Sequence, residues 1–126
     1  MLEKCCPKFG YTYWWITGGD IVRFLVIDRG GTIQLEPSEA KSLFLKARDW
    51  VSDMMNRGKI ELSYALAGQM ASVMVYNVES HEELDDLLQE YPLSNYSVFE
   101  IYPLSDVLHS FETASQTLGM ARPMAA

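Results

Sequence analysis

The stretch VESHEELDDLLQEYPLSNYSVFEIYPL, residues 78–104, encodes a complete helix-to-strand unit. Ser80 and Glu83 form an S-x-x-E capping box, which is a typical start of a helix. The apolar positions that follow fall on one face of that helix and are Leu84, Leu87 and Leu88. Pro92 ends the helix, and SVFEIY at 97–102 predicts a strand.

Upstream of this unit the chain predicts a longer helix and three more strands. Pro37 suits the first turn of a helix and Gly58 suits the left-handed residue just after its end, so we expect a helix over 38–57. Its apolar residues recur at helical spacing and are Leu43, Phe44, Ala47, Trp50, Val51, Met54 and Met55. The strands are predicted at residues 22–28, before a loop at 28–31, and at 60–67 and 71–78, joined by a turn at Gly68-Gln69.

The order of these elements is β-α-β-β-α-β, which predicts an α+β chain of ferredoxin-like topology. In this fold two helices cover one face of a four-stranded antiparallel sheet. The strands at 22–28, 71–78 and 97–102 carry apolar residues at both odd and even positions, so the second face needs a cover as well. The simplest cover is a second copy of the chain, which predicts a homodimer in the form of a dimeric α+β barrel.

The two ends of the chain differ from this middle part. Residues 1–20 have no clear helix or strand period, and we interpret them as an N-terminal extension before a domain at 21–104. Residues 105–126 predict an extra C-terminal helix and a tail, with Ser105 as a cap and Gly119 as a stop. This third helix would cover a groove or a partner.

Composition excludes several classes of protein. A net charge of −7 argues against a nucleic-acid partner, because phosphate binding needs a basic surface. No run approaches the roughly 18 apolar residues of a membrane helix, and adjacent Cys5 and Cys6 are interpreted as reduced thiols, so we expect a cytoplasmic protein without a membrane partner. Two histidines, His81 and His109, and no spaced cysteines argue against a metal site, and we expect no cofactor.

The stretch at 78–104 resembles the muconolactone isomerase family, in the pattern VES-x-x-EL-x-x-LL-x-x-x-PL-x-x-Y-x-x-x-E-x-x-PL. The resemblance extends upstream through Gly68 and Gly58-Lys59 and covers residues 22–104. It implies a dimeric ferredoxin-like barrel that isomerises an unsaturated lactone acid without a cofactor.

The polar residues of the family's middle hairpin are replaced in this chain. The family has a W-x-H-L-W-R run followed by R-Y-A-N. Where the family has the histidine, two arginines and asparagine, the corresponding residues here are Leu62, Ala65, Gln69 and Ser72. A site for an anionic lactone has therefore lost its cations, and we expect little activity on muconolactone itself.

Other polar residues are candidates for a site. A proton shift next to a carbonyl needs a base, for which Glu100 and Glu61 are candidates, and hydrogen-bond donors to the developing enolate. If Glu100 lies in an apolar pocket, desolvation raises its pKa; the alternative is a solvent-facing carboxylate. The candidate ligand-binding residues are Tyr64, Tyr76, Tyr102 and Ser63, although a tyrosine packed in a core is the commoner case.

Three functions fit these observations. The first is a cofactor-free isomerase of a small unsaturated acid or lactone. The second is a non-catalytic module of the same fold that binds a small organic acid or apolar ligand. The third is an oligomeric interaction protein that uses the N-terminal extension and the C-terminal helix.

Overall fold

The computed structural model describes residues 20–31 and 33–119 and has the predicted ferredoxin-like α+β fold. The strands are β1 (Val22–Gly30), β2 (Ile60–Ala65), β3 (Ala71–Val78) and β4 (Ser97–Leu104). They form a four-stranded sheet in the order β2-β3-β1-β4, and every neighbouring pair is antiparallel. The expected N-terminal extension, with Cys5 and Cys6, lies outside the described residues.

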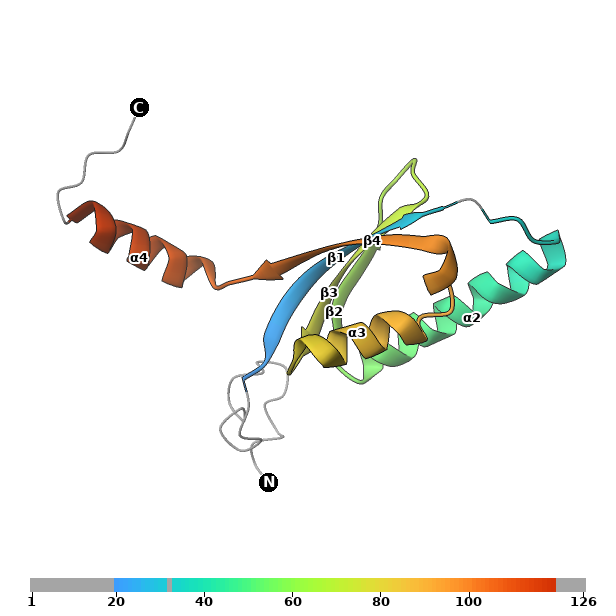
Figure 1. Ribbon diagram of the computed structural model, residues 1–126, viewed down its shortest axis with the longest axis horizontal. Helices are drawn as coiled ribbons and strands as arrows, with labels where there is room; N and C mark the ends of the chain where they lie inside the picture. Colours follow the sequence, from blue (N-terminus) through green and yellow to red (C-terminus); the bar gives the residue numbers. More distant parts are fainter. Residues whose placement is uncertain (1–19, 32, 120–126) are drawn as a thin grey trace, which may run out of the picture.

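Two helices, α2 (Pro37–Asn56) and α3 (His81–Glu90), cover the same face of this sheet (Figure 1). The core between them and the sheet centres on side chains that are almost fully buried: Val26, Met54, Ile60, Met74, Tyr76 and Val78. From α3 this core receives Leu84, Leu87 and Leu88, the apolar face that the sequence predicts. Closely packed apolar side chains therefore fix the helices against the strands.

Local hydrogen bonds define where both helices begin and end. Ser80 accepts from the backbone N–H of Glu83 at 3.0 Å, and Glu83 accepts from the N–H of Glu79 at 2.7 Å, so the predicted cap is confirmed. At the end of α2, Gly58 has a φ of 79°, a conformation that costs a side chain energy but suits glycine. The next N–H, of Lys59, donates to Met54 at 2.9 Å and closes the helix.

Several predicted boundaries were wrong. β4 continues to Leu104 instead of ending at Tyr102. β1 continues to Gly30 instead of ending in a loop at Asp28, because its last residues still pair with β3 and β4. β2 ends at Ala65 rather than at 67. The C-terminal helix α4 (Val107–Gly119) is capped by Asp106, whose Oδ2 accepts from the N–H of His109 at 3.0 Å, and not by Ser105.

The extra helix α4 extends away from the sheet beyond the end of β4 (Figure 1). The larger apolar side chains that it exposes are Val107, Leu108, Phe111 and Leu118. Within the described part of this chain, α4 therefore does not cover a groove, which was one of its two expected roles.

The face of the sheet opposite the helices, which we call the open face, is apolar in its middle. On β1 the side chains of Leu25 and Ile27 lie on it, and their cross-strand neighbours on β3 are Val75 and Val73. Tyr64 of β2, 67% exposed, lies beside Val73. Apolar side chains therefore occupy both faces of the sheet, as the strand patterns predict.

Candidate functional site

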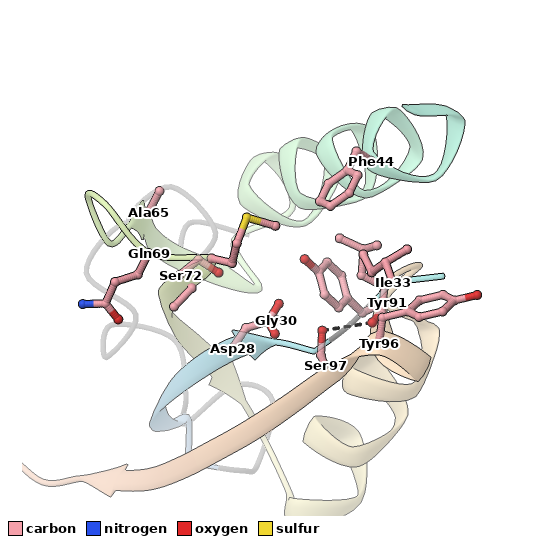
Figure 2. A pocket seen from close by; sticks show the side chains of 13 residues that line it. Asp28, Gly30, Ile33, Phe44, Ala65, Gln69, Ser72, Tyr91, Tyr96 and Ser97 are labelled. Atoms are coloured by element: carbon pink, nitrogen blue, oxygen red, sulfur yellow. Dashed lines mark hydrogen bonds between the residues drawn. The ribbon is translucent and has the colours of Figure 1, made fainter. Parts of the chain in front are cut away.

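A pocket of about 230 Å³ lies on the helix-covered side of the sheet, near the C-terminal end of β1 (Figure 2). The helices and their connections contribute Ile33, Phe44, Tyr91, Leu93 and Tyr96 to its wall. The sheet and the β2–β3 hairpin contribute Asp28, Gly30, Ala65, Gln69, Met70, Ala71, Ser72 and Ser97. The pocket is therefore mostly apolar and aromatic, with a few polar groups near the sheet.

Asp28 is the ionisable residue that the β1 strand turns toward this pocket. It continues the alternation of Phe24 and Val26, so the strand points all three side chains to the helix-covered side. Its cross-strand neighbours are Ser72 on β3 and Phe99 on β4. The close-up shows Asp28 at the sheet side of the pocket, with Ser72 on one side and Tyr91 on the other (Figure 2).

The carboxylate of Asp28 is buried, and one of its two oxygens has no hydrogen-bond partner among the described residues. Its side chain is only 6% exposed, and the oxygen without a partner is Oδ1. A buried polar atom left without a partner costs about 1–3 kcal/mol, and more for a charged group. Asp28 therefore places an acceptor oxygen without a donor beside a pocket. A molecule in the pocket could supply the hydrogen-bond donor.

Tyr91 supplies a hydroxyl on the opposite wall of the pocket. Burial raises the pKa of Tyr91, and the nearby charge of Asp28 and a side-chain hydrogen bond with Asp28 raise it further. The hydroxyl consequently keeps its proton at neutral pH and can donate a hydrogen bond. Contacts with the rings of Trp50 and Phe99, with centroids 5.4 and 6.2 Å away, fix the position of the tyrosine ring.

Two glycines close the rim of the pocket. The N–H of Gly30 donates to the carbonyl of Met70 at 2.7 Å, and the N–H of Gly31 donates to the carbonyl of Tyr96 at 2.7 Å. A Cβ would lie 3.0 Å from the Met70 oxygen at Gly30 and 3.2 Å from the Tyr96 oxygen at Gly31. Glycine therefore allows the end of β1 to lie directly against the hairpin and the turn before β4.

Four of the predicted site residues lie on the open face and not in this pocket. Glu100 binds Arg29 at 2.7 Å and accepts from the hydroxyl of Tyr102 at 3.1 Å. Glu61 binds Arg23 at 2.8 Å. Tyr64 lies on the same face, on the edge strand β2 beside Val73. These four side chains therefore lie on the side of the sheet away from the helices and the pocket.

The other two predicted residues, Tyr76 and Ser63, point to the helix-covered side but do not line the pocket. Tyr76 is completely buried in the core, where its hydroxyl contacts the sulfur of Met74 at 3.8 Å. Ser63 is half-buried opposite Met74 on the neighbouring strand. The core position of Tyr76 is the commoner role that the sequence already suggested for a strand tyrosine.

The surroundings of Glu100 favour the second of its two alternatives, a solvent-facing carboxylate, over an acid in an apolar pocket. The hydrogen bond from Arg29 lowers the pKa of Glu100, and the hydrogen bond from Tyr102 lowers it further. Its side chain is 36% exposed, so these donors outweigh desolvation. Glu100 is accordingly held in its ionised form.

Sequence reasoning missed Asp28 and Tyr91 as site residues. Asp28 stands where the predicted strand at 22–28 meets the predicted loop at 28–31, and Tyr91 directly precedes Pro92, which ends the predicted helix. The signal that could have found Asp28 is its spacing: Phe24, Val26 and Asp28 share one face of a strand. A single acid on an apolar strand face is unusual enough to indicate a site.

The fold and the pocket together define a ferredoxin-like α+β protein with a small, mostly apolar pocket beside the sheet. The sequence model of the muconolactone delta-isomerase family matches residues 31–109. The chain therefore belongs to the muconolactone delta-isomerase family. Asp28 lies just before the matched segment, and most of α4 lies after it.

Individual relatives agree with this assignment. The chain is 28% identical over 71 residues to a muconolactone delta-isomerase of Rhodococcus opacus, covering 56% of this chain and 76% of that protein. It is 32% identical over 63 residues to one of Cupriavidus pinatubonensis, covering 48% and 68%. A crystal structure of muconolactone isomerase superposes with a TM-score of 0.63 at 25% identity and covers 67% of this chain and 88% of that one.

Among the residues that the structure describes, no helix is long and apolar enough to cross a membrane. Within residues 20–31 and 33–119, no group of three or more metal-ligating side chains is close enough to hold a metal ion.

The lowered pKa of Glu100 predicts how the Glu100→Gln variant responds to pH. A carboxylate with a lowered native pKa stabilises the fold above the ordinary glutamate pKa, and this stabilisation is lost as pH falls. We expect the wild type to be more stable than Glu100→Gln at pH 7, and the difference to shrink from pH 5 downward. Thermal melts across this range, with the exposed Glu82→Gln as control, measure it. A variant that becomes relatively more stable as pH rises would indicate a desolvated carboxylate instead.

Proposed function

We propose that this protein is a cofactor-free, isomerase-like protein that binds a small unsaturated lactone or related ring compound in the Asp28 pocket. The observation that carries the proposal is Asp28, a buried acid that lines a mostly apolar pocket and whose Oδ1 has no hydrogen-bond partner among the described residues. Membership of the muconolactone delta-isomerase family supports the same class of chemistry.

The proposed reaction is a 1,3-proton shift next to a carbonyl group. The carboxylate of Asp28 removes a proton from the substrate carbon, so that a C–H bond breaks, an O–H bond forms and the electron pair moves to the carbonyl oxygen as an enolate. The hydroxyl of Tyr91 donates a hydrogen bond to that oxygen. Asp28 then returns the proton to the other end of the allylic system, and the double bond has moved.

Asp28 suits the role of base better than the two glutamates that the sequence suggested. Glu100 and Glu61 each bind an arginine, and the lowered pKa of Glu100 makes it a weaker base. Asp28 has a buried oxygen without a donor and lies in a pocket of suitable size for a small ring. We propose instead that Glu100 and Glu61 help to build a contact between subunits on the open face.

The proposed homodimer follows from the charge pattern of the open face. Arg23 and Arg29 lie at the two ends of β1, each paired with a glutamate, and the apolar Leu25 and Ile27 lie between them. An apolar centre with a polar rim is typical of an interface between subunits. A second copy of the sheet would cover the centre and leave the rim charges paired.

A non-catalytic role is the second candidate, favoured by the exposed apolar residues of α4. Phe111 is 67% exposed and Leu108 is 71% exposed, which is unusual for a helix that serves only its own chain. In that case the pocket would hold a ligand without converting it, and α4 would bind a partner. The two candidates differ in whether Asp28 transfers a proton.

The role of Asp28 predicts loss of proton transfer in a conservative variant. We expect the wild type to catalyse deuterium exchange from solvent into an unsaturated lactone, followed by NMR. Asp28→Asn should lower this rate about 100-fold or more, since a positioned base contributes about that much. Glu100→Gln, which lies on the open face, should leave it nearly unchanged. The proposal fails if Asp28→Asn exchanges at the wild-type rate, or if Glu100→Gln loses activity instead.

Turnover of muconolactone itself should be low, because the hairpin lacks the family's arginines.

The open face predicts a dimer at micromolar concentration. Light scattering should give at least twice the chain mass of 14.3 kDa. Val73→Lys should lower the mass to that of one chain, because Val73 lies between Ile27 and Tyr64 at the centre of the face. Ser52→Lys, on the exposed surface of α2, should remain dimeric. A wild-type mass near 14.3 kDa, or a dimer that Val73→Lys leaves intact, would contradict the proposed interface.

A further inference from the structure

The charges around the pocket indicate which ligands it can accept. Asp28 is the charged side chain among the described lining residues, and none of those lining residues is a lysine or an arginine. The nearby Arg29 points to the open face, where its guanidinium binds Glu100 at 2.7 Å and donates to the far end of the lining residue Gln69 at 3.5 Å. A ligand carboxylate in the pocket would therefore meet a negative charge without a compensating cation.

The remaining polar groups suit a carbonyl compound without a formal charge. The hydroxyl of Tyr91 can donate to a carbonyl oxygen, since burial raises the pKa of Tyr91 and keeps it protonated. Ser72, the cross-strand neighbour of Asp28, adds a second hydroxyl beside the carboxylate. Phe44, Ile33 and Leu93 give the rest of the wall an apolar surface for a ring.

From this arrangement we propose that the pocket selects uncharged unsaturated lactones or ketones and rejects the free carboxylic acids. This inference rests on the proposed function and specifies the substrate class of the same site. Two like charges close together in a partly buried site repel each other, and a tenfold loss of affinity from that repulsion is a large effect for a small ligand. The hairpin of this chain also lacks the cations that the family resemblance implies there, which fits a ligand without a carboxylate.

A matched pair of ligands tests the inference by binding alone. Muconolactone and its methyl ester have the same ring and differ in one charge, and ligand-observed NMR titration gives the affinity of each at pH 7. For the wild type we expect the ester to bind at least tenfold more tightly than the acid. Asp28→Asn, which removes the charge and keeps the shape, should bring the two affinities to within about threefold.

A second variant covers the case in which Asp28→Asn does not fold. Met70 lines the pocket on the hairpin and is 68% exposed, so Met70→Lys adds a cation of similar length at its rim. It should improve binding of the acid about tenfold relative to the ester. Met55→Lys on α2, outside the lining residues, is the matched control and should leave the ratio unchanged.

The outcomes separate this inference from the proposed function. The inference is overturned if wild type binds the acid as tightly as the ester, or if neither Asp28→Asn nor Met70→Lys changes the ratio. It is also overturned if neither ligand binds. If the ester binds preferentially but shows no deuterium exchange, the selection of uncharged ligands stands and the isomerase proposal fails. If only the acid binds and is converted, the isomerase proposal stands and the selection of uncharged ligands fails.

Discussion

The register of β1 determines what each face of this sheet can do. The strand lies between β3 and β4, so its side chains alternate between the helix-covered core and the open face. One set, Phe24 and Val26, fills the core, and Asp28 then reaches the pocket where the helices no longer cover the sheet completely. The other set places two arginines around Leu25 and Ile27. A shift by one residue would exchange the two sets and bury the arginines.

The position of Asp28 depends on its neighbours as much as on β1. Gly30 and Gly31 let the strand end lie against the hairpin and the turn before β4, which leaves a narrow space above the carboxylate. Tyr91 follows the last turn of α3, and the capping box of Ser80 and Glu83 fixes where that helix starts. The site therefore combines short local signals with one long-range constraint, the pairing of β1 with both β3 and β4.

The sequence predicted the fold well because the fold depends on local patterns. The capping box, Pro37, Gly58 and the leucine face of α3 each determine a nearby boundary, and their order specifies the ferredoxin-like topology. The site was harder to predict because strand position does not reveal which face is covered. Glu100 and Asp28 are both acids on neighbouring strands, yet cross-strand pairing turns one to the open face and the other to the pocket. The residues in which the family resemblance implies a site lie on the hairpin, whereas the buried acid lies before the segment that the family model matches.

Mapping of a bound lactone onto the backbone most directly tests whether the Asp28 pocket is the ligand site. The probe is 2(5H)-furanone, an uncharged unsaturated lactone, added to 15N-labelled protein while amide NMR shifts are followed. The largest shifts should occur at Asp28, Gly30, Ser72 and Tyr91, and residues of the open face such as Leu25 and Val73 should move little. Saturable shifts concentrated on the open face or on α4, with Asp28 and Tyr91 unaffected, would show that the ligand site lies elsewhere.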